Sequence, residues 1–175
     1  MTPSRPGWRA LVTGMLFMGG VLSGCAGKPI RDGVYVDEAK GFRVRVPRNG
    51  WQVVDARGAD LAFRDVPSEA RLAVWARCPE PEAGPLTGLA RHLFFGLRQV
   101  EWLRQGEILV DGVAGLETVV KGQFEGVPMQ VRSVVIRRKG CLYDLLLVAP
   151  PETFGAQDTD FDHFLKGWQF LSDSP

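Results

Sequence analysis

Histidine is scarce in this 175-residue sequence, and the motifs of common catalytic sites are missing from it. Its two histidines, His92 and His163, fall on predicted helices and lack the H-E-x-x-H spacing of a zinc site. The sequence has no G-x-S-x-G, no phosphate-binding P-loop and no G-x-G-x-x-G. We therefore predict no catalytic residue, no cofactor and no metal site.

An acidic run near the C-terminus comes nearest to a metal motif. Asp158-x-Asp160-x-Asp162 begins like a calcium loop, but the sixth position is His163 instead of Gly and the twelfth is Gln169 instead of Glu. We favour helix capping by this run over calcium binding.

A strong net charge of either sign is also absent. The full chain carries a formal charge of +1, and removal of residues 1–24 with Arg5 and Arg9 would change it to −1. A nearly neutral chain creates no field that attracts nucleic acid, so we predict no nucleic-acid partner. One basic cluster lies along a predicted hairpin, and we expect it to form a solvated strand face: Arg132, Arg137, Arg138 and Lys139.

No apolar run is long enough to favour a membrane-spanning helix, which needs about 20 apolar residues. Residues 10–21 are free of charge and follow Arg5 and Arg9. A short apolar core behind a positive flank is typical of a signal peptide, which we place at residues 1–24.

Leu22-Ser23-Gly24-Cys25 ends this region and resembles the lipobox of bacterial lipoproteins. The Cys25 thiol can carry a diacylglycerol as a thioether, and Ser23 and Gly24 are small enough for a peptidase to cleave before it. The resemblance implies a further acyl chain, such as palmitate, on the new N-terminus, and two or more chains anchor a protein stably. The alternative is an ordinary secretory signal with a chance cysteine.

The predicted anchor also indicates a location. Residues 25–32 form a short tether that holds the domain within about 15 Å of the lipid by coil statistics. Ala26 follows Cys25, so nothing resembles the Asp-based inner-membrane retention signal of Gram-negative lipoproteins. We therefore expect a protein of the cell envelope, lipid-anchored on the periplasmic side and in the outer membrane rather than the inner one.

Residues 33–175 suit a single domain and contain the other two cysteines, Cys78 and Cys141. An oxidising compartment permits a disulfide between them. Both cysteines lie at predicted strand ends, where Cα atoms of neighbouring strands can approach closely enough for a bond. Two inert buried thiols are the alternative, and the sequence leaves both open.

The apolar pattern predicts short strands and two helices. A helical stripe from Leu86 to Leu97 predicts the first helix, and Thr159-x-x-Asp162, a capping-box variant, places the start of the second near Asp160. Leu145, Leu146 and Leu147 are apolar on both strand faces, which predicts a central strand covered on both sides. The predicted strands are residues 33–37, 42–47, 51–55, 61–66, 71–78, 108–110, 116–124, 127–138 and 141–149.

The layout of the domain resembles the PsbP-like superfamily with its DcrB-like bacterial lipoproteins. Four motifs carry the resemblance: Gly41-Phe42, Pro47-x-x-Gly50-Trp51, Phe161-x-x-Phe164-Leu165 and the final Trp168-Gln169-Phe170. The resemblance implies an α+β fold: a central antiparallel β-sheet with helices packed on both faces. It also implies a binding or accessory protein, and it supplies no catalytic motif.

Phe95 lies nearly opposite the apolar face of the first predicted helix, and Trp102 would join it if the helix continued. Exposed together, they would mark an interface with a partner protein or with the membrane. In the alternative that we favour, Gly96 ends the helix early and Trp102 folds inward.

Two function classes remain. The favoured one is a non-catalytic, membrane-anchored binding or accessory/assembly factor with an envelope protein as partner. The alternative is a membrane-tethered hydrolase that uses scattered carboxylates with His92 or His163, or Cys141 as a nucleophile. A deep pocket that gathers carboxylates with a histidine would favour the hydrolase, whereas shallow grooves would favour the binding protein.

Overall fold

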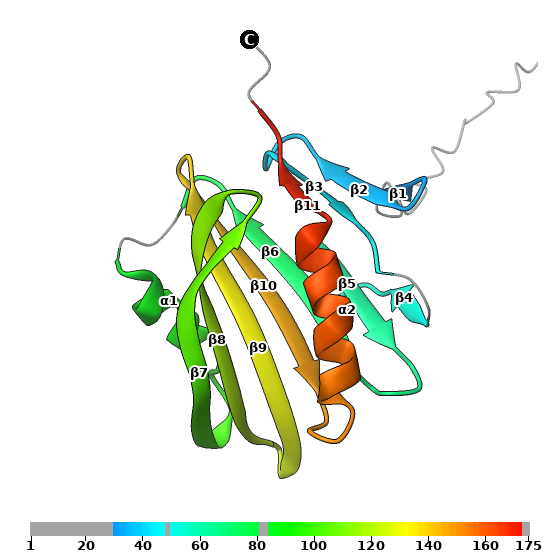
Figure 1. Ribbon diagram of the computed structural model, residues 1–175, viewed down its shortest axis with the longest axis vertical. Helices are drawn as coiled ribbons and strands as arrows, with labels where there is room; N and C mark the ends of the chain where they lie inside the picture. Colours follow the sequence, from blue (N-terminus) through cyan, green and yellow to red (C-terminus); the bar gives the residue numbers. More distant parts are fainter. Residues whose placement is uncertain (1–29, 48–49, 81–83, 173–175) are drawn as a thin grey trace, which may run out of the picture.

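Alternating apolar side chains build a seven-stranded antiparallel sheet in the computed structural model, which describes residues 30–47, 50–80 and 84–172 (Figure 1). The signal peptide, Cys25 and most of the tether lie outside these residues. In the part that is described, no helix is long and apolar enough to cross a membrane. In spatial order the strands are β4 (Trp51–Val53), β5 (Leu61–Asp65), β6 (Arg71–Arg77), β10 (Cys141–Ala149), β9 (Val127–Arg138), β8 (Val113–Phe124) and β7 (Arg98–Val110).

A second, four-stranded sheet caps one end of the first (Figure 1). Its strands β1 (Ile30–Arg31), β2 (Val34–Asp37) and β3 (Phe42–Arg45) come from the start of the domain, and β11 (Trp168–Phe170) pairs with β3. The predicted strands at 33–37 and 42–47 are thus confirmed, and they pair with each other. Because Ile30 pairs with Tyr35, strand structure begins inside the stretch expected to be a tether.

The antiparallel sheet of the predicted α+β fold is present, but the two helices are few and short for the expected packing on both faces. Helix α2 (Phe154–Lys166) packs with Val134 and Ile136 of β9, whereas α1 (Leu86–His92) packs on Val135 between them. Neighbouring residues of a strand point to opposite faces, so the helices are on different sides. Only seven residues long, α1 covers a small part of its face.

Strand β10 is the fourth of seven, as Leu145, Leu146 and Leu147 predicted. Leu145 and Leu147 are fully buried in the main core with α2. Leu146, on the other face, is only half-buried, because α1 does not extend over it.

The first helix begins at Leu86 as predicted, but it ends before Leu97, and the second helix begins earlier than predicted. Helix α1 ends at His92, and the chain turns through Gly96, with φ of +93°, into β7. Helix α2 begins at Phe154 rather than near Asp160, so Thr159-x-x-Asp162 lies inside it. The Thr159 hydroxyl donates to the Gly155 carbonyl within the helix instead of capping it.

Strand β7 begins ten residues earlier than the Ile108 start that the sequence predicted. It is an edge strand whose residues 101–107 are all exposed, so its sequence shows no buried alternation. Two register shifts, between Arg98 and Glu101 and between Trp102 and Arg104, interrupt its pairing with β8. Such irregularities, with charged side chains, hinder pairing with another chain along an edge.

Both tyrosines of the chain are buried where the two sheets meet, and this predicts an alkaline titration. Burial, followed by the charge of nearby Asp37, raises the pKa of Tyr35 to about 12, and burial also raises that of Tyr143. A free phenol has a pKa of about 10. We therefore expect little tyrosinate absorbance from the native protein at about pH 10.5, where unfolded protein is largely ionised.

The same pKa shift makes stability depend on pH. The pKa of Tyr35 is higher in the folded state than in the unfolded state. Its contribution to the free energy of unfolding is therefore complete below pH 10 and is lost as pH rises towards 12. Tyr35→Phe should remove this part of the alkaline loss in urea unfolding. Native protein that is half ionised at about pH 10 would contradict the prediction.

Candidate functional site

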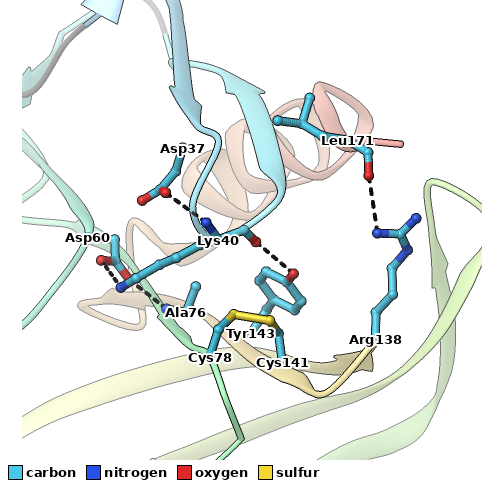
Figure 2. The surroundings of a disulfide bond; sticks show 9 residues. All are labelled: Asp37, Lys40, Asp60, Ala76, Cys78, Arg138, Cys141, Tyr143 and Leu171. Carbon is cyan, nitrogen blue, oxygen red and sulfur yellow. Dashed lines mark hydrogen bonds and ion pairs between the residues drawn. A yellow bond between two sulfur atoms is a disulfide. The ribbon is translucent and has the colours of Figure 1, made fainter. Parts of the chain in front are cut away.

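Cys78 and Cys141 form a disulfide in the structure, with their Cα atoms 4.5 Å apart (Figure 2). Cys78 directly follows β6 and Cys141 begins β10, the neighbouring strand. Of the two alternatives that the sequence left open, the structure therefore contains the bond. A bonded Cys141 has no thiolate to act as the nucleophile of a hydrolase.

The surroundings of the disulfide are structural contacts (Figure 2). The Tyr143 hydroxyl donates to the Lys40 carbonyl at 2.8 Å, and the Lys40 ammonium binds the carboxylate of Asp60. Asp60 also accepts the backbone N–H of Ala76 at 2.6 Å. These contacts tie the turn between β2 and β3 to the end of the large sheet.

Arg132 does not lie on a solvated strand face as expected, because it is buried between β9 and α2 with 4% of its surface exposed. Its guanidinium donates to Glu117 at 2.6 Å, to Asp158 at 2.8 Å and to Asp162 at 2.7 Å. It also lies 5.2 Å from the Phe161 ring centre. Burial lowers its pKa, but the hydrogen bonds to the two aspartates outweigh this effect and the pKa is raised overall. Arg132 is therefore a permanent internal cation that joins α2 to the sheet.

The other three residues of the basic cluster lie nearer the surface than Arg132. Arg137 donates to both carboxylate oxygens of Glu80, and these hydrogen bonds raise its pKa. Arg138 lies over the Phe170 ring at 4.9 Å. Lys139 is exposed in the turn before β10.

The acidic run neither caps α2 nor forms a calcium loop. Asp158 and Asp162 face Arg132 one helical turn apart, and Asp160 accepts the indole N–H of Trp51 at 2.9 Å. Each carboxylate thus has a structural partner. Among the described residues, no group of three or more His, Cys, Asp or Glu side chains could hold a metal ion.

The two histidines lie at the surface and on different helices. His92 ends α1 and His163 lies in α2, on opposite faces of the sheet, and both side chains are exposed. The fold therefore does not bring them to one site.

Phe95 and Trp102 both reach the surface, but through a different structure from the predicted helix. Phe95 follows α1 in a turn and is 93% exposed, whereas Trp102 lies on β7 and is 48% exposed. The Trp102 ring packs edge-on against Phe94 at 5.6 Å. The favoured alternative is thus half right: the helix ends early, but Trp102 folds only partly inward.

Two further exposed apolar residues lie near the turn that contains Phe95 and Gly96, and the sequence did not reveal them. Phe124 and Val127 form the last pair at the β8–β9 turn, and both are about half exposed. A Cβ on Gly96 would lie 3.4 Å from the Phe124 ring, so the β8–β9 turn lies against Gly96, the residue after Phe95. We call the set Phe95, Trp102, Phe124 and Val127 the apolar end patch.

The face of the sheet opposite α2 is also hollowed, forming a cavity of about 420 Å³ over β5, β6 and β10. Its floor is made by Ala62 and Ala73, which are direct cross-strand partners, and by Leu146 beside Ala73. Two short side chains opposite each other leave a depression between their taller neighbours. We call this depression the open groove.

Solved structures show which fold this is. Cyanobacterial PsbP (CyanoP) from Synechocystis sp. PCC 6803 matches with a TM-score of 0.61 at 19% identity over 87% of this chain and 98% of that chain. LpqN of Mycobacterium tuberculosis, described as involved in cell envelope biogenesis, matches at 0.53 and 11% identity over 72% of this chain and 81% of that one. The Ran-binding protein Mog1p of Saccharomyces cerevisiae matches at 0.55 and 7% identity over 82% and 97%.

No sequence-family model and no curated protein sequence matches the chain. At these identities the structural matches establish a PsbP-like fold and nothing more specific.

Proposed function

We propose that this protein is a lipid-anchored, non-catalytic protein of the cell envelope that binds a partner protein through the apolar end patch. The observation that carries the proposal is the patch itself, above all Phe95 with 93% of its surface exposed. A contiguous exposed apolar surface often marks a protein interface, and aromatic residues dominate binding energies there.

The PsbP-like fold supports a binding role by analogy. Mog1p, with the same fold, is a Ran-binding protein, and LpqN is involved in cell envelope biogenesis. In this chain the bonded Cys141 removes the candidate nucleophile, and both histidines are exposed at the surface, which weighs against the hydrolase alternative.

The position of the patch favours a protein over the membrane as its partner. Strand β9 has 12 residues and is therefore roughly 40 Å long. Phe124 and Val127 of the patch lie at its Val127 end and Trp102 lies nearer the middle, while Arg138 at the other end contacts the four-stranded sheet that contains β1 (Figure 1). A lipid on Cys25, five residues before Ile30, would hold the β1 end at the membrane and leave the patch facing away from it.

Site-specific photo-crosslinking in cells tests the partner. A benzophenone amino acid at Phe95 should give a crosslink to another protein, and the same probe at Val36, an exposed apolar residue of the small sheet, should not. Because Phe124 belongs to the same patch, Phe124→Ser should weaken the Phe95 crosslink. Crosslinks only to lipid or only to a second copy of this chain, or a crosslink that Phe124→Ser leaves unchanged, would contradict the proposal.

The anchor needs a separate test, since Cys25 is proposed as the lipidation site in the outer membrane. Cys25→Ala should release the protein from the membrane fraction or leave it as an uncleaved precursor without lipid mass. A variant that stays in the membrane with the mass of the wild-type mature protein would rule out lipidation at Cys25.

A further inference from the structure

The open groove has a cationic wall whose side chains form no ion pair with the described residues. Arg64 of β5 and Arg71 of β6 are direct cross-strand partners, and both line the groove. Like charges directly opposite each other on a sheet are destabilising. A pair of arginines held side by side is therefore a feature that a bound anion would explain.

Neither arginine side chain has an ion-pair partner among the described residues. The Nε of Arg64 is also buried and makes no hydrogen bond in that part of the chain. Asp55 lines the same groove but forms no ion pair with either of them. A buried donor without an acceptor is costly, so Arg64 and Arg71 together provide a ready site for a carboxylate or similar anion.

The remainder of the groove is apolar. Trp75 lies on β6 at the end of the groove away from Arg71, with Ala73 between them, and Leu146 of β10 lies beside Ala73. Val148 lies beside Arg71 at the charged end. The groove thus has a charged side with Arg64 and Arg71, and beside it an apolar floor with Ala62, Ala73 and Leu146.

A peptide is a poor occupant for such a floor. Strands β5, β6 and β10 are all internal to the sheet, whose edges are β4 and β7. Their backbone groups are already paired, so an added strand could form no main-chain hydrogen bonds here. A flat membrane surface is also a poor fit, because the groove is recessed.

We infer that the open groove binds a single-chain anionic lipid, with its carboxylate on Arg64 and Arg71 and its acyl chain over Ala73 and Leu146 towards Trp75. This site is separate from the apolar end patch, so either proposal can fail without the other. A volume of about 420 Å³ is within the range of small-ligand sites.

A photoreactive fatty acid tests the inference on the full chain in its own membrane. Diazirine-bearing palmitate should label the peptides that contain Trp75 and Leu146, and the matching diazirine alcohol, which lacks the charge, should label them much less. The double variant Arg64→Gln/Arg71→Gln should lower the labelling by about ten-fold or more, since it removes charge-assisted hydrogen bonds.

Two further variants make the outcome decisive. Arg45→Gln/Arg98→Gln changes the charge equally at two exposed arginines outside the groove and should keep wild-type labelling. Ala73→Leu fills the floor without changing charge and should abolish labelling, even if the double arginine variant proves unstable in thermal melting. Equal labelling by the alcohol, labelling spread over other peptides, or full labelling of either groove variant would overturn the inference.

Discussion

Removing the bond between Cys78 and Cys141 is expected to lower the free energy of unfolding by about 4 kcal/mol on the chain-entropy model. The two residues are 63 positions apart, so the bond closes a long loop in the unfolded chain. In the folded state β6 and β10 are already held together by a continuous ladder of paired residues. The bond should therefore act mainly by restricting the unfolded chain.

Urea unfolding of oxidised and reduced wild-type protein measures this effect without changing an atom of the core. A loss of about 4 kcal/mol would lower the melting temperature by roughly 10 °C for a domain of this size. Cys78→Ala/Cys141→Ala should have the lower stability and should not respond to reductant. Titration of two thiols besides any on Cys25, in denatured and unreduced protein, would show that the bond is absent.

The strands that the sequence predicted best are those whose turns and buried alternation agree. Residues 127–138 and 141–149 were predicted with the bounds that the structure has. Glu125-Gly126 and Lys139-Gly140 all have positive φ, as tight two-residue hairpin turns require. Here the local sequence and the sheet impose the same conformation.

The first half of β7 could not be predicted in this way. Residues 101–107 are exposed on an edge strand, so neither strand face has an apolar pattern. Their extended conformation depends on pairing with β8, which contributes Val120 opposite Trp102 and Thr118 opposite Gln105. Such partners are known only once the fold is known.

The candidate sites depend on the same long-range neighbours. Phe95 was recognisable as an outward aromatic residue, but its neighbour Phe124 comes from another turn. The open groove exists because Ala62 and Ala73 face each other across two strands. The sequence contains both alanines, but it does not show that they are cross-strand partners.

Arg132→Met is expected to lower the free energy of unfolding by about 3 kcal/mol, the lower end of what breaking a buried ion pair costs. The loss arises because Glu117, whose side chain is only 12% exposed, would keep its charge without its buried partner. Asp158 and Asp162 are more exposed, at 30% and 49%, and water can solvate them. Arg104 would still bind Glu117 from outside, which limits the loss.

Arg104→Met provides the matched control, because Arg104 binds the same carboxylate at 2.8 Å but is 56% exposed. An exposed ion pair contributes about 1 kcal/mol or less, so the two variants should differ clearly in urea unfolding. Glu117→Gln should restore part of the stability lost in Arg132→Met, since it removes the stranded charge. Equal losses in Arg132→Met and Arg104→Met, or no restoration by Glu117→Gln, would mean that burial of Arg132 does not determine its contribution.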